Sequence, residues 1–171
     1  MTKHYGVYSA LAVLVMTAAL AAVPVLAGHA AAGAKPIDAC SLLTKEEIQA
    51  AVGKPAEAGK PNTRANVAGG SLCDFKVGDY GSVGVMTVPV GSANTYDKTL
   101  AGLKKMGTKT EDAPGIGDHS FFAYPGYGMI QLNTWKGSLY IIITLIVPGA
   151  TEAQEKPMAE KLMGKILEKL K

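Results

Sequence analysis

The chain has 171 residues, of which 48% are hydrophobic and 18% charged, and its 17 Lys and Arg against 14 Asp and Glu give a formal net charge of +3 at pH 7. A charge this close to balance excludes recognition of nucleic acid or of an anionic membrane surface by electrostatics alone. With two cysteines and three histidines the chain has little material for a metal site, so we expect neither a metal nor a cofactor.

The first 27 residues have the pattern of a signal peptide. Lys3 is the only lysine in this stretch, acidic residues are absent from it, and residues 10–27 are apolar or small except for Thr17. A basic start followed by a short apolar run ending in small residues directs a chain to export. We therefore predict a signal peptide over residues 1–27 and a secreted or periplasmic location.

The cleavage site is predicted after Ala27, with Ala30, Ala32 and Ala34 as later alternatives. An uncleaved membrane anchor is the competing interpretation, because about 18 apolar residues are close to the minimum that spans a bilayer. After cleavage we expect no stable membrane insertion. Residues 28–36 contain no large apolar side chain and are predicted to be a flexible lead-in to a single domain over residues 37–171.

Cys40 and Cys73 are predicted to form one structural disulfide, because an exported chain meets an oxidising medium. The bond would close a loop of about 34 residues and stabilise the fold by about 3 to 4 kcal/mol on the chain-entropy model. A metal or redox thiol pair is the alternative, but this spacing is far from Cys-x-x-Cys.

The first helix is predicted to begin at Thr44, because Thr44 and Glu47 have the spacing of a capping box. Gly53 and Pro55 end it. Residues 54–71 show no sustained period and are expected to form a surface connection in which a brief strand could form. Two β-prone runs then follow, at residues 72–77 and 82–90, and they indicate a hairpin.

A second helix is predicted after residue 92, with Ser92 or Asn94 as its cap. Its apolar residues recur at helical spacing and should form one buried stripe: Tyr96, Leu100, Leu103 and Met106. Residues 108–118 are expected to be a loop.

Three further strands are predicted at residues 119–124, 129–135 and 139–147. The last of these is apolar on both faces, so we expect it in the middle of the sheet. A terminal helix follows, capped by Thr151 and Gln154. Together these elements predict an α+β fold: a twisted antiparallel sheet of about five strands with two or three helices packed on one face.

Asp118, His119 and Ser120 are three catalytic residue types side by side, which raises the hypothesis of a hydrolase that uses Asp118 and His119. Neighbours on an extended strand point to opposite faces, whereas a triad needs side chains that converge. We therefore predict no catalytic residue and keep the hydrolase as an alternative.

The aromatic residues gather in the last third of the chain. Cross-strand packing is the first interpretation for them. Tyr124, Tyr127 and Trp135 could instead lie on a rim and stack on a sugar, peptide or lipid, so they are the candidate ligand-binding residues.

Several short motifs occur together in this chain. Residues 38–44 read Asp-Ala-Cys-Ser-Leu-Leu-Thr, and later come Cys73-Asp74-Phe75 and Gly115-Ile116-Gly117-Asp118. This combination resembles an uncharacterised bacterial family of small secreted proteins and lipoproteins that open with an Ala-Cys-Ser-Leu-Leu-Thr helix. The resemblance covers most of residues 37–147. It implies export and an α+β sheet domain, but no substrate or active-site residue, and this chain lacks the processing-site cysteine of the lipoprotein members.

The sequence as a whole favours an exported, non-catalytic binding or accessory protein of the cell envelope. Its expected partner is an envelope protein or a small ligand, and not nucleic acid. The hydrolase and a membrane-anchored structural protein with an uncleaved leader are the alternatives.

Overall fold

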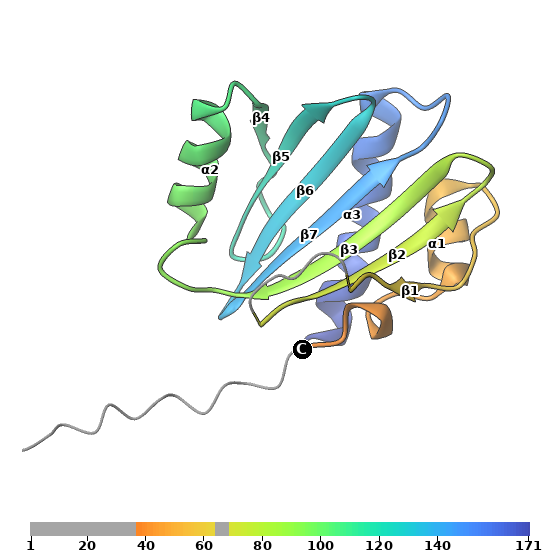
Figure 1. Ribbon diagram of the computed structural model, residues 1–171, viewed down its shortest axis with the longest axis horizontal. Helices are drawn as coiled ribbons and strands as arrows, with labels where there is room; N and C mark the ends of the chain where they lie inside the picture. Colours follow the sequence, from red (N-terminus) through yellow and green to blue (C-terminus); the bar gives the residue numbers. More distant parts are fainter. Residues whose placement is uncertain (1–36, 64–68) are drawn as a thin grey trace, which may run out of the picture. The chain divides into compact units, whose positions relative to one another are not determined.

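A computed structural model of the protein describes residues 37–63 and 69–171. The predicted signal peptide, its cleavage sites, the uncleaved-anchor alternative and the lead-in all lie outside the described residues. Within the described part the fold is α+β, as expected, with three α-helices and one antiparallel sheet (Figure 1).

The sheet has seven strands in the order β1-β2-β3-β7-β6-β5-β4, and every neighbouring pair is antiparallel. The strands are β1 (Lys60–Pro61), β2 (Ser71–Val77), β3 (Gly81–Pro89), β4 (Lys109–Asp112), β5 (His119–Gly126), β6 (Met129–Lys136) and β7 (Leu139–Ile146).

The position of β7 in the middle of the sheet confirms the prediction from its sequence. β7 pairs with β3 on one side and with β6 on the other. Ile141, Ile143 and Leu145 are fully buried on one face, and Ile142 is buried on the other. A strand that is largely apolar on both faces is favoured in the centre of a sheet, because it there pairs with a neighbour on each edge.

The expected count of about five strands was wrong, because the sheet has seven. The two additional strands are the shortest ones, β1 and β4, and they form the two edges. β1 lies in the predicted surface connection and β4 in the predicted loop. Both are too short to show a period of two, and β4 carries Lys109, Glu111 and Asp112, which are typical of an edge rather than of a buried strand.

One face of the sheet carries the larger core, and helices α1 (Lys45–Val52) and α3 (Glu152–Lys169) pack on it, behind the strands in Figure 1. Ile48 of α1 and Leu162 and Ile166 of α3 are fully buried against the inward residues of β2, β3, β6 and β7. The short 3-10 helix η1 (Ala39–Ser41) also joins this core through Ala39.

The opposite face carries a smaller core, and helix α2 (Tyr96–Lys105) packs against its β4–β5 side. Tyr96, Leu100 and Leu103 pack against this core as the predicted stripe, but they are half-buried rather than buried. Met106 was wrongly included, because it lies past the end of the helix and is exposed. Two of the three helices thus lie on one face of the sheet, and the third covers part of the other.

The caps predicted for the first and last helices are confirmed. Thr44 Oγ1 accepts from the Glu47 N–H at 3.2 Å, and Glu47 Oε2 accepts from the Thr44 N–H at 2.8 Å. At the start of α3, Gln154 Oε1 accepts from the Thr151 N–H at 2.9 Å.

The cap expected for α2 was wrong. Its N-cap is Thr95, whose side chain makes no capping bond. The Asn94 side chain instead closes the preceding turn: its Oδ1 accepts from the Gly91 N–H and its Nδ2 donates to the Pro89 carbonyl.

The predicted disulfide is confirmed: Cys40 and Cys73 are joined, with Cα atoms 5.0 Å apart. Cys73 is fully buried on β2, and Cys40 lies in η1. The bond therefore fastens the opening segment of the domain to the sheet.

Replacing both cysteines by serine (Cys40→Ser with Cys73→Ser) should lower the free energy of unfolding by about 3 to 4 kcal/mol, because the unfolded chain regains the loop entropy that the crosslink removes. Urea unfolding followed by circular dichroism measures the loss. The wild-type protein in reductant should lose a similar amount. An unchanged midpoint in both cases would contradict a stabilising role for the bond.

Glu155 is a buried carboxylate near the start of α3, with a side chain that ties the helix to the end of β7. It is 3% exposed, and its Oε1 accepts from the Val147 N–H at 2.9 Å. Burial raises the pKa of Glu155, although the bond from Val147 acts in the opposite direction, and the nearby Glu152 carboxylate raises it further.

The raised pKa means that the folded protein holds the Glu155 proton more tightly than the unfolded chain does. The contribution of Glu155 to the free energy of unfolding is therefore full below the unfolded pKa of about 4.3, and it falls as the pH rises through the raised pKa. Glu155→Gln removes this titration and keeps an acceptor for Val147. The stability of Glu155→Gln minus that of the wild type should therefore increase with pH across this window, as measured by urea unfolding at several pH values.

The pH-dependent contributions of the other carboxylates to stability cancel in that difference, because both proteins contain these groups. Glu160→Gln is the control, since Glu160 is exposed on the same helix and is not among the groups that shift the pKa of Glu155. A difference for Glu155→Gln that stays flat or decreases as the pH rises would contradict the role assigned to burial.

Candidate functional site

Asp118, His119 and Ser120, the residues of the catalytic hypothesis, lie at the start of β5. Their side chains point in different directions. His119 lies on the face that α2 covers, and its ring centroid is 5.0 Å from that of Tyr96. Ser120 is buried on the other side of the strand. This is the alternation expected of an extended strand.

The Asp118 carboxylate is bound to the β6–β7 turn. Its Oδ1 accepts from Lys136 Nζ at 2.8 Å and its Oδ2 from the Gly137 N–H at 2.7 Å. The bond from Lys136, followed by that from Gly137, holds the pKa of Asp118 below its usual value. Asp118 therefore closes a turn and does not orient the His119 ring.

The Ser120 hydroxyl is also used inside the fold. It lies 2.5 Å from the Ala113 carbonyl oxygen and 2.9 Å from the Ile116 carbonyl oxygen, so that these two acceptors share its hydrogen. These contacts hold the 113–118 loop against β5. A nucleophilic serine needs a base beside its oxygen, and here the neighbours are carbonyl groups.

The geometry therefore argues against a hydrolase built on Asp118, His119 and Ser120. Among residues 37–63 and 69–171, no three His, Cys, Asp or Glu side chains come together as a metal ion would require. No helix within the same ranges is long and apolar enough to cross a membrane.

The three candidate ligand-binding aromatics are not brought together by the fold. Trp135 is 5% exposed, stacks on Tyr140 with a centroid distance of 4.2 Å, and donates from Nε1 to the Asn94 carbonyl. Tyr124 lies on the opposite face, where its hydroxyl donates to Glu111 Oε2. Tyr127 is 100% exposed at the tip of the β5–β6 turn. They therefore do not form one continuous stacking surface.

A partly exposed area does occur on the α2 face of the sheet, over β2, β3, β7 and β6. α2 lies beside β4 and β5, and Figure 1 shows no helix in front of these other four strands in the described part of the chain. We refer to this area as the open face. Its central row of cross-strand neighbours is polar or small, and consists of Asp74, Gly84, Thr144 and Gln131.

The side chains of this row lie close to one another. Gln131 Nε2 lies 3.4 Å from Thr144 Oγ1. Gly84 has no side chain, and a Cβ there would lie 3.4 Å from Asp74 Oδ1. Since these groups are half-buried and polar, they can offer hydrogen bonds to a partner that lies across the strands.

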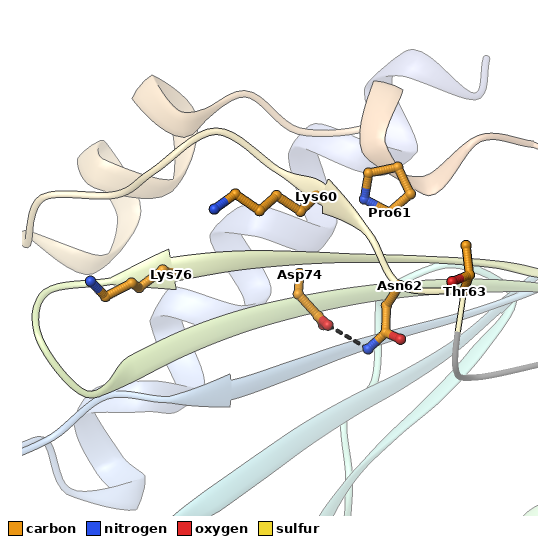
Figure 2. A pocket seen from close by; sticks show the side chains of 6 residues that line it. All are labelled: Lys60, Pro61, Asn62, Thr63, Asp74 and Lys76. Carbon is orange, nitrogen blue, oxygen red and sulfur yellow. Dashed lines mark hydrogen bonds between the residues drawn. The ribbon is translucent and has the colours of Figure 1, made fainter.

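A pocket of about 370 Å³ adjoins this row at the β1–β2 edge (Figure 2). It is lined by Lys60, Pro61, Asn62, Thr63, Asp74 and Lys76. Asn62 Nδ2 donates to Asp74 Oδ2 at 2.6 Å. The amines of Lys60 and Lys76 lie 3.6 and 3.2 Å from Glu57, whose pKa is lowered chiefly by the hydrogen bond from Lys76.

The pocket combines donors from lysine and amide groups with the acceptors of a carboxylate, which is the chemistry of a site for a polar ligand. The segment that leads into β1 packs closely on the disulfide: a Cβ on Gly59 would lie 2.6 Å from Cys73 Sγ, so only glycine permits this segment to pack this tightly.

The sequence pattern did not identify these residues as a site. The only available signal was the alternation of β2, in which Asp74 and Lys76 fall between buried neighbours. That pattern predicts a polar outer face but not a pocket, because the pocket also needs the short strand β1.

Comparisons of the chain with models of protein families, with curated proteins and with solved structures gave no match. The resemblance to a family of secreted proteins and lipoproteins therefore stays a prediction from the motifs.

Ser120→Ala should lower the free energy of unfolding by about 1 to 2 kcal/mol, because it leaves two carbonyl groups without their donor. Thermal or urea unfolding measures this. Ser138→Ala, in the exposed β6–β7 turn, is the matched control and should change stability by less than about 0.5 kcal/mol. Unchanged stability in Ser120→Ala, together with loss of a hydrolytic activity, would contradict the structural role.

Proposed function

We propose that the protein is an exported, non-catalytic binding or accessory protein of the cell envelope, and that it binds its partner through the open face and the adjoining pocket. The observation that carries the proposal is a contrast within one domain. Side chains with catalytic potential are held in structural bonds, whereas a polar area on the sheet is left without a helix over it in the described part.

The polarity of the open face supports a polar partner. Asp74, Thr144 and Gln131 are partly exposed and alternate with buried apolar residues of the same strands. Non-obligate interfaces are about as polar as the rest of a protein surface, and their hydrogen bonds set orientation. The expected occupant is a polar small ligand or a polar segment of an envelope protein.

Export is supported by the leader pattern and by the disulfide, a bond that persists in oxidising compartments and is rare in the cytosol. The secreted or periplasmic location is part of the proposal.

Gly84→Arg tests the binding surface. The backbone of Gly84 is not in the left-handed region, and a Cβ there meets its neighbours at ordinary contact distance, so the variant should fold and place a long side chain across the open face. Affinity capture from the native envelope, with the full-length protein as bait and mass spectrometry as readout, should lose its partner with Gly84→Arg.

Gly102→Arg is the matched control, because Gly102 lies on the exposed side of α2, and a Cβ added there would have no neighbouring atom within 4 Å. It should retain the partner as the wild type does. Failure of the wild type to retain anything, or equal retention by Gly84→Arg, would contradict the proposal.

A further inference from the structure

A second cavity, of about 310 Å³, lies near the opposite edge of the sheet, between the start of α2 and the 113–118 loop. Its lining includes Tyr96, Asp112, Ile116 and His119. Ligand cavities in proteins start at about 300 Å³, so this one suits a small molecule. It is separate from the open face and its pocket, with which it shares no lining residue.

Two aromatic rings form one wall of this cavity. The centroids of the Tyr96 and His119 rings are 5.0 Å apart, with an angle of 33° between the planes. The Tyr96 ring is also fixed by edge contacts with Phe121 and Trp135, at centroid distances of 5.7 and 5.4 Å. A ring held in this way presents its electron-rich surface to a ligand without first having to be ordered.

The electrostatic surroundings of Tyr96 are negative. Burial raises the pKa of the Tyr96 phenol most, and the carboxylates of Asp112 and Asp97 raise it further. The Asp112 carboxylate makes no hydrogen bond or ion pair with the residues that the structure describes. Asp118 also lines the cavity, but Lys136 already balances its charge.

The cavity lining contains no lysine or arginine among the described residues. An aromatic wall beside an uncompensated carboxylate attracts positive charge and repels anions, because the ring quadrupole and the carboxylate act with the same sign.

We propose that this cavity binds a small organic ammonium ion, which contacts the Tyr96 ring and faces the Asp112 carboxylate. The apolar groups around the nitrogen pack against Ile116 and the rings, and the charge is balanced by Asp112.

The protein contains its own reporter for this binding. Trp135 is the only tryptophan of the chain and its ring contacts that of Tyr96, so occupation of the cavity should change its fluorescence. The full-length protein is titrated with choline chloride and with 3,3-dimethylbutan-1-ol, in which carbon replaces the charged nitrogen, at ionic strength matched with sodium chloride. Choline should give a saturable change, and the neutral alcohol should bind about tenfold more weakly or not at all.

Asp112→Asn removes the charge but keeps the shape of the side chain, and should weaken choline binding by about threefold to tenfold. Asp79→Asn, in the exposed turn between β2 and β3, is the matched control and should leave it unchanged. Tyr96→Phe should retain binding, because the ring is kept, and Tyr96→Leu should lose it.

Three outcomes would overturn the inference: no saturable response to choline, an equal response to the alcohol, or equal affinities of Asp112→Asn and Asp79→Asn. None of them depends on the capture experiment with Gly84→Arg, because Gly84 is not among the residues that line this cavity.

Discussion

The disulfide between Cys40 and Cys73 is the constraint on which the arrangement of the binding surface depends. It joins η1 to a fully buried position on β2. The segment that carries β1 packs directly on it, because Gly59 leaves space only for Cys73 Sγ and the Phe75 ring. β1 has two residues and little apolar surface of its own, so it depends on this contact and on its pairing with β2. The crosslink therefore supports β1, which lines the pocket beside the open face.

The two faces of the sheet divide structural and binding roles. α1, α3 and η1 cover one face and enclose the larger core, which accounts for most of the large buried side chains. α2 covers only the β4–β5 side of the other face. The smaller core on that face includes the stacked rings of Phe121, Trp135 and Tyr140. Partial cover leaves polar cross-strand neighbours accessible at one edge and a cavity with an aromatic wall at the other. Surfaces of this kind are supported by a rigid scaffold and need no catalytic group.

The sequence predicted what depends on local patterns. Thr44 and Glu47 cap their helix through neighbours close in sequence, and the apolar residues of β7 determine its place through burial. The disulfide joins residues 33 apart, and it was predictable because the chain has only two cysteines. The sequence did not predict β4, because four residues with three charges show no strand period. It missed the Thr95 cap, because Asn94 bonds backward to Pro89 and Gly91.

The residues of the candidate site could not be predicted from the sequence. Lys60 lies on β1, Asn62 directly follows it and Asp74 lies on β2, and only the register of β1 against β2 brings them together. The candidate aromatics Tyr124, Tyr127 and Trp135 were chosen by type, and the fold separates them.

The Cys40–Cys73 bond anchors the segment that carries β1 and is the main structural support for the proposed export. Its presence is tested by titration of free thiols, on protein purified from its native source without reductant and unfolded in denaturant with a thiol-reactive dye. We expect no reactive thiol per molecule before reduction and two after it. Two reactive thiols before reduction would show that the bond is absent, so that the segment carrying β1 would lack its anchor and the proposed export its main structural support.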